Sequence, residues 1–165
     1  MVEIEAPRAG CPGLVRLEPG DDAAVARLFG RMTPESIYRR FFSPISRVEQ
    51  FTSSVLRVDR HDRAAVAAVA GGEVVGVAQY SRAPGACTAD LAIMVADAWQ
   101  RQGLGTRMVA ALADRAAAEG VASFEVDVQG DNFGALRLLE RVAPGVRLAF
   151  SAGVGEGSFP IESHR

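Results

Sequence analysis

The sequence contains no lysine, since all 18 of its Lys and Arg residues are arginine. This absence excludes the nucleoside-triphosphate loop in which a lysine follows the last glycine and contacts phosphate. It also means that the chain has no side-chain primary amine. If the protein acts on side-chain amines, they belong to another molecule.

Cysteine and histidine are also scarce, with two of each. Cys11 and Cys87 lie far apart without C-x-x-C spacing, so we expect both to be free and reduced. No histidine stands near Cys87 in the sequence to activate it as a nucleophile. His61 and His164 are too few and too dispersed for a zinc site, so we predict no metal.

Long hydrophobic runs and an excess of basic charge are missing as well. No apolar run is long enough to cross a membrane, and the start, with Glu3 and Glu5, lacks the basic-then-apolar order of a secretion signal. The formal net charge of −2 gives no electrostatic reason to bind nucleic acid. We therefore expect a cytoplasmic protein with neither a membrane nor a nucleic acid as partner.

The most informative stretch joins an apolar strand at residues 89–95 to an apolar helix at residues 106–118 through a glycine-rich turn. The first N–H groups of a helix have no partner within it, and the helix dipole adds roughly half a positive charge there. Gly103 and Gly105 lack Cβ atoms and let the main chain approach a ligand closely. Because each contact contributes only about 0.3–1 kcal/mol, we expect several amides to bind a diphosphate together.

This turn has two other interpretations, a dinucleotide-binding loop and an ordinary turn that binds no ligand. A dinucleotide-binding fingerprint requires a third glycine, and Met108 stands at its place. An ordinary glycine turn into a packed helix requires no ligand, and this interpretation stays open.

The pattern Gln100-x-x-Gly103-x-Gly105, preceded by Val95 at the end of a strand, resembles the acetyl-coenzyme A signature of the GNAT N-acetyltransferase superfamily. The order of the expected elements over residues 14–150 is similar to that of the family. Strands are expected at residues 14–18, 64–70, 74–81, 89–95 and 121–128, and helices at residues 21–30, 34–42, 47–57, 106–118 and 132–142.

This resemblance implies a single-domain α/β fold with a mixed, mostly antiparallel central sheet, a splayed parallel strand pair and flanking helices. The 165 residues, 48% of them hydrophobic, suit one such core. We expect residues 1–13 to be an N-terminal extension and residues 14–165 to form the GNAT domain. Because residues 153–157 are rich in glycine, we expect the last strand to be irregular.

Residues 36–42 read S-I-Y-R-R-F-F and resemble the S-x-Y-x-R-F-F segment of GNAT domains in the Pat-like group of bacterial protein lysine acetyltransferases. In a helix, Tyr38, Phe41 and Phe42 share one side and would pack as a lid over the sheet. The two arginines between them, Arg39 and Arg40, would point elsewhere.

The resemblance implies transfer of an acetyl group from acetyl-coenzyme A to a primary amine, most simply a lysine of a partner protein. The amine must be neutral to attack, and a lysine with the usual pKa near 10.4 is neutral in roughly one molecule in a thousand at pH 7. A carboxylate that accepts the ammonium proton typically raises the rate by about 10²–10⁴. We therefore expect a carboxylate near the acetyl group.

Asp90 is the candidate for this general base, because Pat-like proteins place a catalytic glutamate at the matching position, ten residues before Gln100. Aspartate is one methylene shorter, so a water relay or a different base stays open, as does a merely solvated carboxylate. Glu125 and Asp127 form a rival pair, since they alternate on one face of the strand at residues 121–128. Two carboxylates also occur in glycosidases, but the anion-binding turn does not support that reaction.

The resemblance also implies a set of acetyl-coenzyme A contacts: Met94, Val95, Gln100, Arg101, Gln102, Gly103, Leu104, Gly105, Thr106 and Asn132. The main chain at Met94 and Val95 would pair with the pantetheine arm, and the Val95 N–H would stabilise the thioester oxygen. Asn132 is equally well suited to cap the helix that follows it. Many family members have a tyrosine as general acid where this sequence has Leu139, so no side-chain acid is assigned.

Two alternatives to a protein acetyltransferase remain. The first is an enzyme for small amines such as polyamines or aminoglycosides, which an acidic acceptor cleft would favour. The second is a non-catalytic sensor domain that binds coenzyme A. The sequence leaves open the acceptor, the length of the acyl chain and the oligomeric state, a homodimer included.

Overall fold

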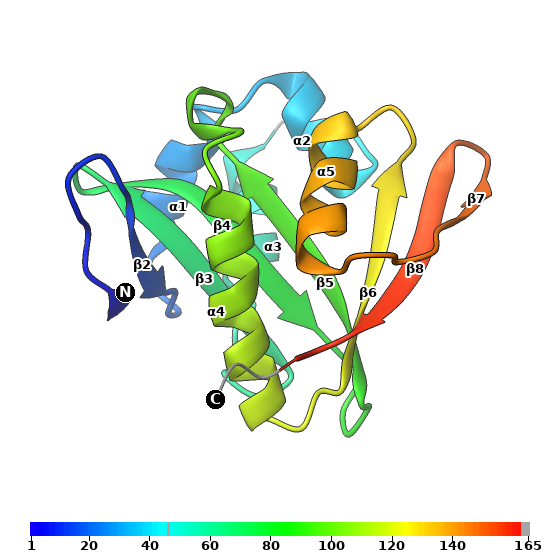
Figure 1. The fold of residues 1–165 in the computed structure, drawn as a ribbon. Helices are drawn as coiled ribbons and strands as arrows, with labels where there is room; N and C mark the ends of the chain where they lie inside the picture. The colour runs from blue at the N-terminus through cyan, green and yellow to red at the C-terminus, as the bar shows by residue number, and fades with distance from the viewer. Residues whose placement is uncertain (46, 163–165) are drawn as a thin grey trace.

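The structure is a computed structural model that describes residues 1–45 and 47–162, so His164 lies outside the described residues. Within them, eight strands form one mixed sheet in the order β1-β2-β3-β4-β5-β6-β8-β7 (Figure 1). The strands are β1 (Val2–Glu5), β2 (Gly13–Arg16), β3 (Arg63–Ala70), β4 (Glu73–Ser81), β5 (Thr88–Val95), β6 (Ser123–Gln129), β7 (Ala149–Ser151) and β8 (Val154–Pro160). The helices are α1 (Asp22–Phe29), α2 (Pro34–Phe41), α3 (Val48–Val55), α4 (Leu104–Ala118) and α5 (Phe133–Val142), with a short 3₁₀ helix η1 at Asp97–Trp99.

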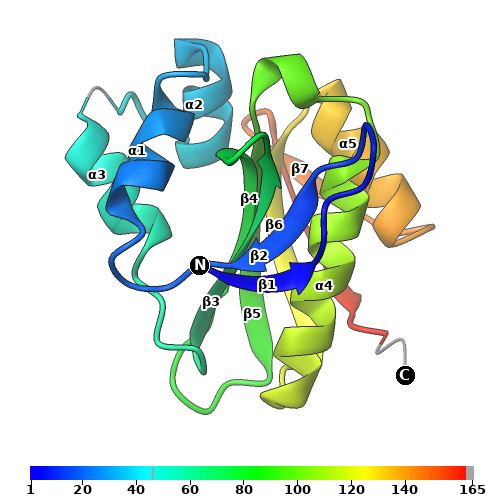
Figure 2. The same cartoon turned by 90° about the vertical axis from the view of Figure 1, so that its left-hand side faces the viewer.

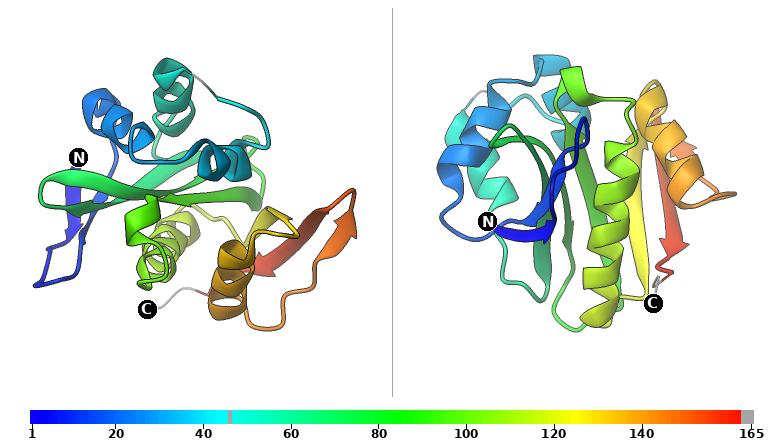
Figure 3. Two further views of the ribbon diagram at one scale, coloured as in Figure 1. Left: turned by 90° about the horizontal axis from the view of Figure 1, so that it is seen from above. Right: turned by 60° about the vertical axis from the view of Figure 1, so that its left-hand side comes forward.

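The central strands are apolar on both sides because helices cover both faces of the sheet. Helices α1, α2 and α3 lie on one face, and α4 and α5 lie on the other (Figures 2 and 3). Successive side chains of a strand point to opposite faces. In β3, Ala64 and Val66 accordingly pack in the core beside α4, while Ala65 and Ala67 pack in the core beside α1–α3. This two-sided burial explains the nearly continuous apolar sequence.

One strand pair in the described sheet, β5 with β6, is parallel, and it is short. Its paired residues are Thr88 with Ser123, Ala89 with Phe124 and Asp90 with Glu125. On its other side β5 stays paired with β4 as far as Val95. Strands β5 and β6 therefore separate after Asp90, and the sheet splays open next to the second half of β5.

The predicted fold class is confirmed, including the splayed parallel pair, and the predicted elements match the observed ones within two residues at each end. Strand β1 was not predicted. It pairs with β2 at the edge of the sheet, and its residues are too exposed to give a burial pattern. The division of the chain at residue 13 stays a prediction. Among the described residues, no helix has both the length and the apolar character needed to cross a membrane.

The expected irregularity of the last strand is wrong, since β8 pairs with β6 from Val154 to Pro160 without a break. The glycines of β8 have another cause. A Cβ atom at Gly155 would lie 2.8 Å from the Phe150 ring, and one at Gly157 would lie 2.6 Å from Leu148 Cδ2. Glycine thus allows Leu148 and the Phe150 ring of β7 to lie close over a regular strand.

Candidate functional site

The turn between β5 and α4 leaves the start of α4 open. Gly103 has a φ of 76° and Arg101 a φ of 62°, so the chain enters the helix through two left-handed residues. The helix begins at Leu104, and no side chain caps it. Its first N–H groups and the positive end of its dipole are thus available to an anion, as the sequence predicts.

The two glycines of this turn have different roles. Gly103 supplies a positive φ, and a Cβ atom added there would meet nothing within 4 Å. A Cβ atom at Gly105 would lie 3.0 Å from Leu138 Cδ2 and 3.3 Å from Ile93 Cδ1. Gly105 therefore lets α5 and β5 approach the first turn of α4.

The glutamine that opens the signature binds the protein itself. Gln100 Nε2 donates to the Val95 carbonyl at 3.0 Å and lies 3.4 Å from Asp97 Oδ1. Asp97 Oδ1 also accepts a hydrogen bond from the Ser36 hydroxyl on α2, at 2.9 Å. These bonds hold the turn to the end of β5 and to the helix that covers it.

The main chain of Val95 faces the opening of the splay. In an antiparallel pair, residues alternate between bonding the neighbouring strand and pointing away from it. The Ala96 N–H donates to the Val75 carbonyl at 2.8 Å, so Val95, one residue earlier, directs its N–H away from β4. On that side β6 pairs with β5 only as far as Asp90. The Val95 N–H is therefore directed into the space between the splayed strands.

A cavity of about 620 Å³, here called the loop cavity, lies beside the turn. All residues predicted to contact acetyl-coenzyme A line it except Gln102, which is exposed and donates to the Ala98 carbonyl at 3.2 Å. Five arginines and one carboxylate line the cavity: Arg39, Arg40, Arg101, Arg137, Arg141 and Asp131. This excess of positive charge suits a polyanionic ligand.

Asn132 caps the helix that follows it and lies beside the loop cavity. Its Oδ1 accepts a hydrogen bond from the Ala135 N–H at 3.2 Å and thus caps α5, and the residue also lines the loop cavity. The cap is confirmed, whereas the coenzyme contact stays a prediction. Phe133, the next residue, is 67% exposed and lines the same cavity.

A second cavity of about 550 Å³, here called the α3 cavity, lies between α3 and strands β4 and β5. Asp90 lines it, but Glu125 and Asp127 line neither this cavity nor the loop cavity. Asp90 and Glu125 are nevertheless register partners, at the last pair before the strands separate. Of the predicted carboxylates, Asp90, an exposed residue, is thus the one that lines a cavity next to the splay.

The comparison with known families agrees with this arrangement. The sequence profile described as the Acetyltransferase (GNAT) family matches residues 31–143, which include α2, the splayed strands and the turn. The chain belongs to the GNAT acetyltransferase family. A search of the curated protein sequences finds no match.

Solved GNAT structures share the fold. The GNAT domain of S. lividans PAT is 23% identical, with a TM-score of 0.83 and 90% of each chain covered. A cAMP-binding acyltransferase from Mycobacterium smegmatis is 24% identical, with a TM-score of 0.66, over 98% of this chain and 47% of that one. A putative acetyltransferase from Salmonella typhimurium, solved with acetyl-coenzyme A, is 14% identical, with a TM-score of 0.72, over 93% of this chain and 96% of that one.

Arg40 is the residue near the GNAT site that the sequence reasoning missed. It lines both cavities, its guanidinium carbon lies 4.5 Å from the centre of the Phe41 ring, and burial lowers its pKa to about 10. Its Nε is buried and has no hydrogen-bond acceptor among the described residues. Arg40 therefore places a guanidinium with an unsatisfied buried donor in the wall shared by the two cavities.

The expected packing of the aromatic residues in this segment holds for Phe41, which packs against the core, and is wrong for Tyr38 and Phe42. Tyr38 and Phe42 are 45% and 38% exposed, whereas Ile37 is 4% exposed and packs in the core. Residues 37, 40 and 41 lie at i, i+3 and i+4, so they share a helix face, and that face brings Arg40 inward. Ile37 was the signal in the sequence that could have predicted this orientation.

No tyrosine lines the loop cavity. Leu139, at the place of the usual acid, is buried in the core. Tyr80 donates its hydroxyl hydrogen to the His61 carbonyl at 2.9 Å, and burial raises the pKa of the phenol. Among the described residues no three His, Cys, Asp or Glu side chains gather as metal ligands would.

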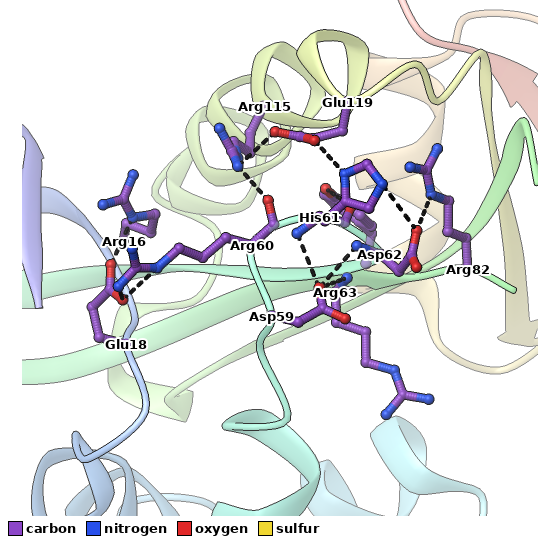
Figure 4. Close-up of polar contacts among 11 residues, drawn as sticks. Arg16, Glu18, Asp59, Arg60, His61, Asp62, Arg63, Arg82, Arg115 and Glu119 are labelled. Atoms are coloured by element: carbon purple, nitrogen blue, oxygen red, sulfur yellow. Dashed lines mark hydrogen bonds and ion pairs between the residues drawn. The ribbon is translucent and has the colours of Figure 1, made fainter. Parts of the chain in front are cut away.

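A polar cluster holds the loop before β3 against the far end of α4 (Figure 4). His61 Nδ1 lies 2.5 Å from Glu119 Oε2, and Arg82 Nε donates to Asp62 Oδ1 at 2.8 Å. The carboxylate of Asp59 accepts three main-chain N–H bonds within the same loop. These contacts fix the loop that leads from α3 into the wall of the α3 cavity.

Proposed function

We propose that the protein is an acetyl-coenzyme A-dependent N-acetyltransferase that acts on a primary amine, namely a lysine of a partner protein. The observation that carries this proposal is the loop cavity, which combines an uncapped helix start with five arginines at the mouth of a splayed strand pair. Its volume of about 620 Å³ lies within the usual 300–1,000 Å³ of ligand sites. The acetyl-coenzyme A in the Salmonella structure of the same fold supports this assignment.

The residues present fit such a donor. Coenzyme A carries a diphosphate and a further phosphate, and the amides of Gly103 to Thr106 together with the cavity arginines supply donors of the required sign. Bound there, acetyl-coenzyme A would supply an acetyl group activated as a thioester. The Val95 N–H, which points into the splay, would donate to the oxygen on which negative charge develops.

Asp90 would accept the proton of the attacking ammonium, directly or through a water molecule. Its place in the α3 cavity, on the strand that also borders the loop cavity, supports this role over Glu125 and Asp127. Leu139 is buried and neither of the two tyrosines lines the loop cavity, so we assign no side chain to protonate the thiolate. A thiol with an ordinary pKa near 8.5 can leave as thiolate or take a proton from water.

The acceptor assignment is supported by the segment at residues 36–42, which is similar to that of Pat-like domains, and by the fold of the S. lividans PAT domain. A polyamine or aminoglycoside acceptor loses its support, because the α3 cavity is not acidic: three arginines line it against one carboxylate. A cytoplasmic location stays a prediction.

The test is a thiol-release assay with the full chain, acetyl-coenzyme A and lysine-containing peptides, combined with calorimetry of acetyl-coenzyme A binding. We expect binding and release of coenzyme A in proportion to acetylated peptide. Binding without release above hydrolysis for any amine would favour the sensor, and no binding at millimolar concentration would refute the proposal.

A further inference from the structure

The α3 cavity has an excess of positive charge. Its lining includes Arg40, Arg57 and Arg63 against a single carboxylate, Asp90. The ion pairs found in the described part of the chain involve other arginines, so none of these three guanidinium groups forms a close ion pair there. The charge of Arg63 acts on Asp59 and contributes to its lowered pKa, which leaves Arg40 and Arg57 as the charges available to a ligand.

Arg40 is built into the wall between the two cavities. Its Nε is buried without an acceptor, and the Phe41 ring covers the guanidinium at 4.5 Å. A buried donor that lacks a partner is unfavourable, and an anionic group such as a carboxylate suits the guanidinium because the two can form parallel hydrogen bonds. The empty donor therefore points to an anionic group on the ligand.

The position of the charge identifies which ligand carries that group. Arg40 lines both cavities, but Arg57 and Arg63 line only the α3 cavity, where Asp90 lies. An excess of positive charge therefore also lies on the side of the amine, in addition to that on the side of the acyl donor. Asp90 would receive the ammonium proton, and the arginines beside it would disfavour an acceptor of purely positive charge.

We infer that the acceptor carries a carboxylate near its reactive amine, and that Arg40 and Arg57 hold this carboxylate in the α3 cavity. The inference rests on the proposed acetyltransferase function and narrows its substrate class. Two sources share the chemistry: acidic residues that flank a lysine in a protein, and the carboxylate of a free amino acid. Diamines of the same length without a carboxylate would be poor acceptors.

The experiment compares acceptors that differ in the carboxylate alone, with the full chain and acetyl-coenzyme A. Nα-acetyl-lysine is paired with N-acetylcadaverine, which has the same amine and lacks the carboxylate. A peptide with a lysine between two aspartates is paired with one that has two asparagines. We expect kcat/KM to be at least about tenfold higher for the acidic member of a pair and the difference to shrink at high salt. The acceptor pair with the larger ratio of kcat/KM values shows whether the carboxylate belongs to a free amino acid or to acidic residues that flank a lysine.

Two substitutions, Arg40→Gln and Arg57→Gln at an exposed residue, should each bring the ratio of kcat/KM between the acidic and the neutral acceptor toward one. Arg147→Gln, at an exposed residue that lines neither cavity, is the matched control and should keep it. Arg57→Gln also covers the case in which Arg40→Gln does not fold. Loss of the ratio in these variants, with acetyl-coenzyme A binding retained in Arg57→Gln, would support the inference.

Equal or faster turnover of the neutral acceptors would overturn the inference and leave the proposed function intact. A preference for succinyl- over acetyl-coenzyme A that Arg40→Gln abolishes would also overturn it, since Arg40 would then serve the acyl group. If no acceptor is turned over, calorimetry of the two small amines decides. Tighter binding of Nα-acetyl-lysine that Arg57→Gln removes would support the inference, and equal binding would refute it, independently of catalysis.

Discussion

The side-chain amide of Gln100 donates a hydrogen bond to the main-chain carbonyl of Val95, 3.0 Å away. The first residue of the coenzyme signature is thus bonded to the end of the strand that precedes it. Because the Val95 carbonyl is occupied in this way, the Val95 N–H remains the main-chain polar group of this residue that is directed into the splay. The glutamine positions the turn and the strand end relative to each other.

Removing this bond should weaken coenzyme binding. A typical hydrogen bond contributes about 0.5–1.5 kcal/mol, so Gln100→Leu should raise the Kd for acetyl-coenzyme A by about two- to tenfold. Gln129→Leu, at the end of β6 and outside both cavities, is the control. Calorimetry measures both, and an unchanged Kd in Gln100→Leu would show that the bond does not hold the turn in place.

Asp90→Asn should lower kcat by about 10²–10⁴ at neutral pH, the usual contribution of a general base, and leave the Kd for acetyl-coenzyme A unchanged. The activity that remains should rise with pH, because the amine then loses its proton to solvent. Glu125→Gln changes the register partner of Asp90 and should have little effect. If Glu125→Gln proves the more damaging variant, the base has been assigned to the wrong strand of the pair.

Gly103→Ala separates backbone strain from coenzyme binding. A left-handed residue with a Cβ costs about 1–2 kcal/mol, and Gly103 has a φ of 76° with open space around it. Gly85→Ala, between β4 and β5 with a φ of 75° and equally open space, should lose similar stability in urea unfolding. Only Gly103→Ala should also bind acetyl-coenzyme A more weakly. Equal affinities of the two variants would speak against phosphate binding at this turn.

The Glu119 carboxylate should make the free energy of unfolding depend on pH in the acidic range. Its hydrogen bond with His61, and then the charge of Arg115, hold the pKa of Glu119 below the usual value of 4.5 in the folded protein. A lowered pKa gives stability that is present above 4.5 and is lost as the pH falls through the folded value. Urea unfolding should therefore show a shallower loss of stability below pH 4.5 for Glu119→Gln than for the parent protein or for Glu140→Gln, an exposed control. Parallel curves would exclude this contribution.

Local sequence alone determined much of the scaffold. The apolar residues of α4 recur at helical spacing, and Met108 and Leu112 are indeed fully buried. In β6, Phe124 is buried and Glu125 exposed, as the alternation predicts. The turn around Gly103 is also local, because its conformation and the open helix start depend on a few consecutive residues. These features follow from periodicity and backbone preference, which need no distant partner.

Only the tertiary structure decided the rest. Strand β1 pairs with the edge that β2 offers it; its four residues alternate between apolar and acidic, but the run is short and mostly exposed. Asp90 and Glu125 look equivalent in sequence and are both exposed, but the packing of α3 forms a cavity that Asp90 lines and Glu125 does not. From the sequence, Arg40 is expected to point away from the aromatic side of its helix, but the orientation of α2 brings its guanidinium inward over the Phe41 ring. The physical reason is common to all three: burial and pairing depend on elements that are distant in the chain, and a one-dimensional pattern does not contain them.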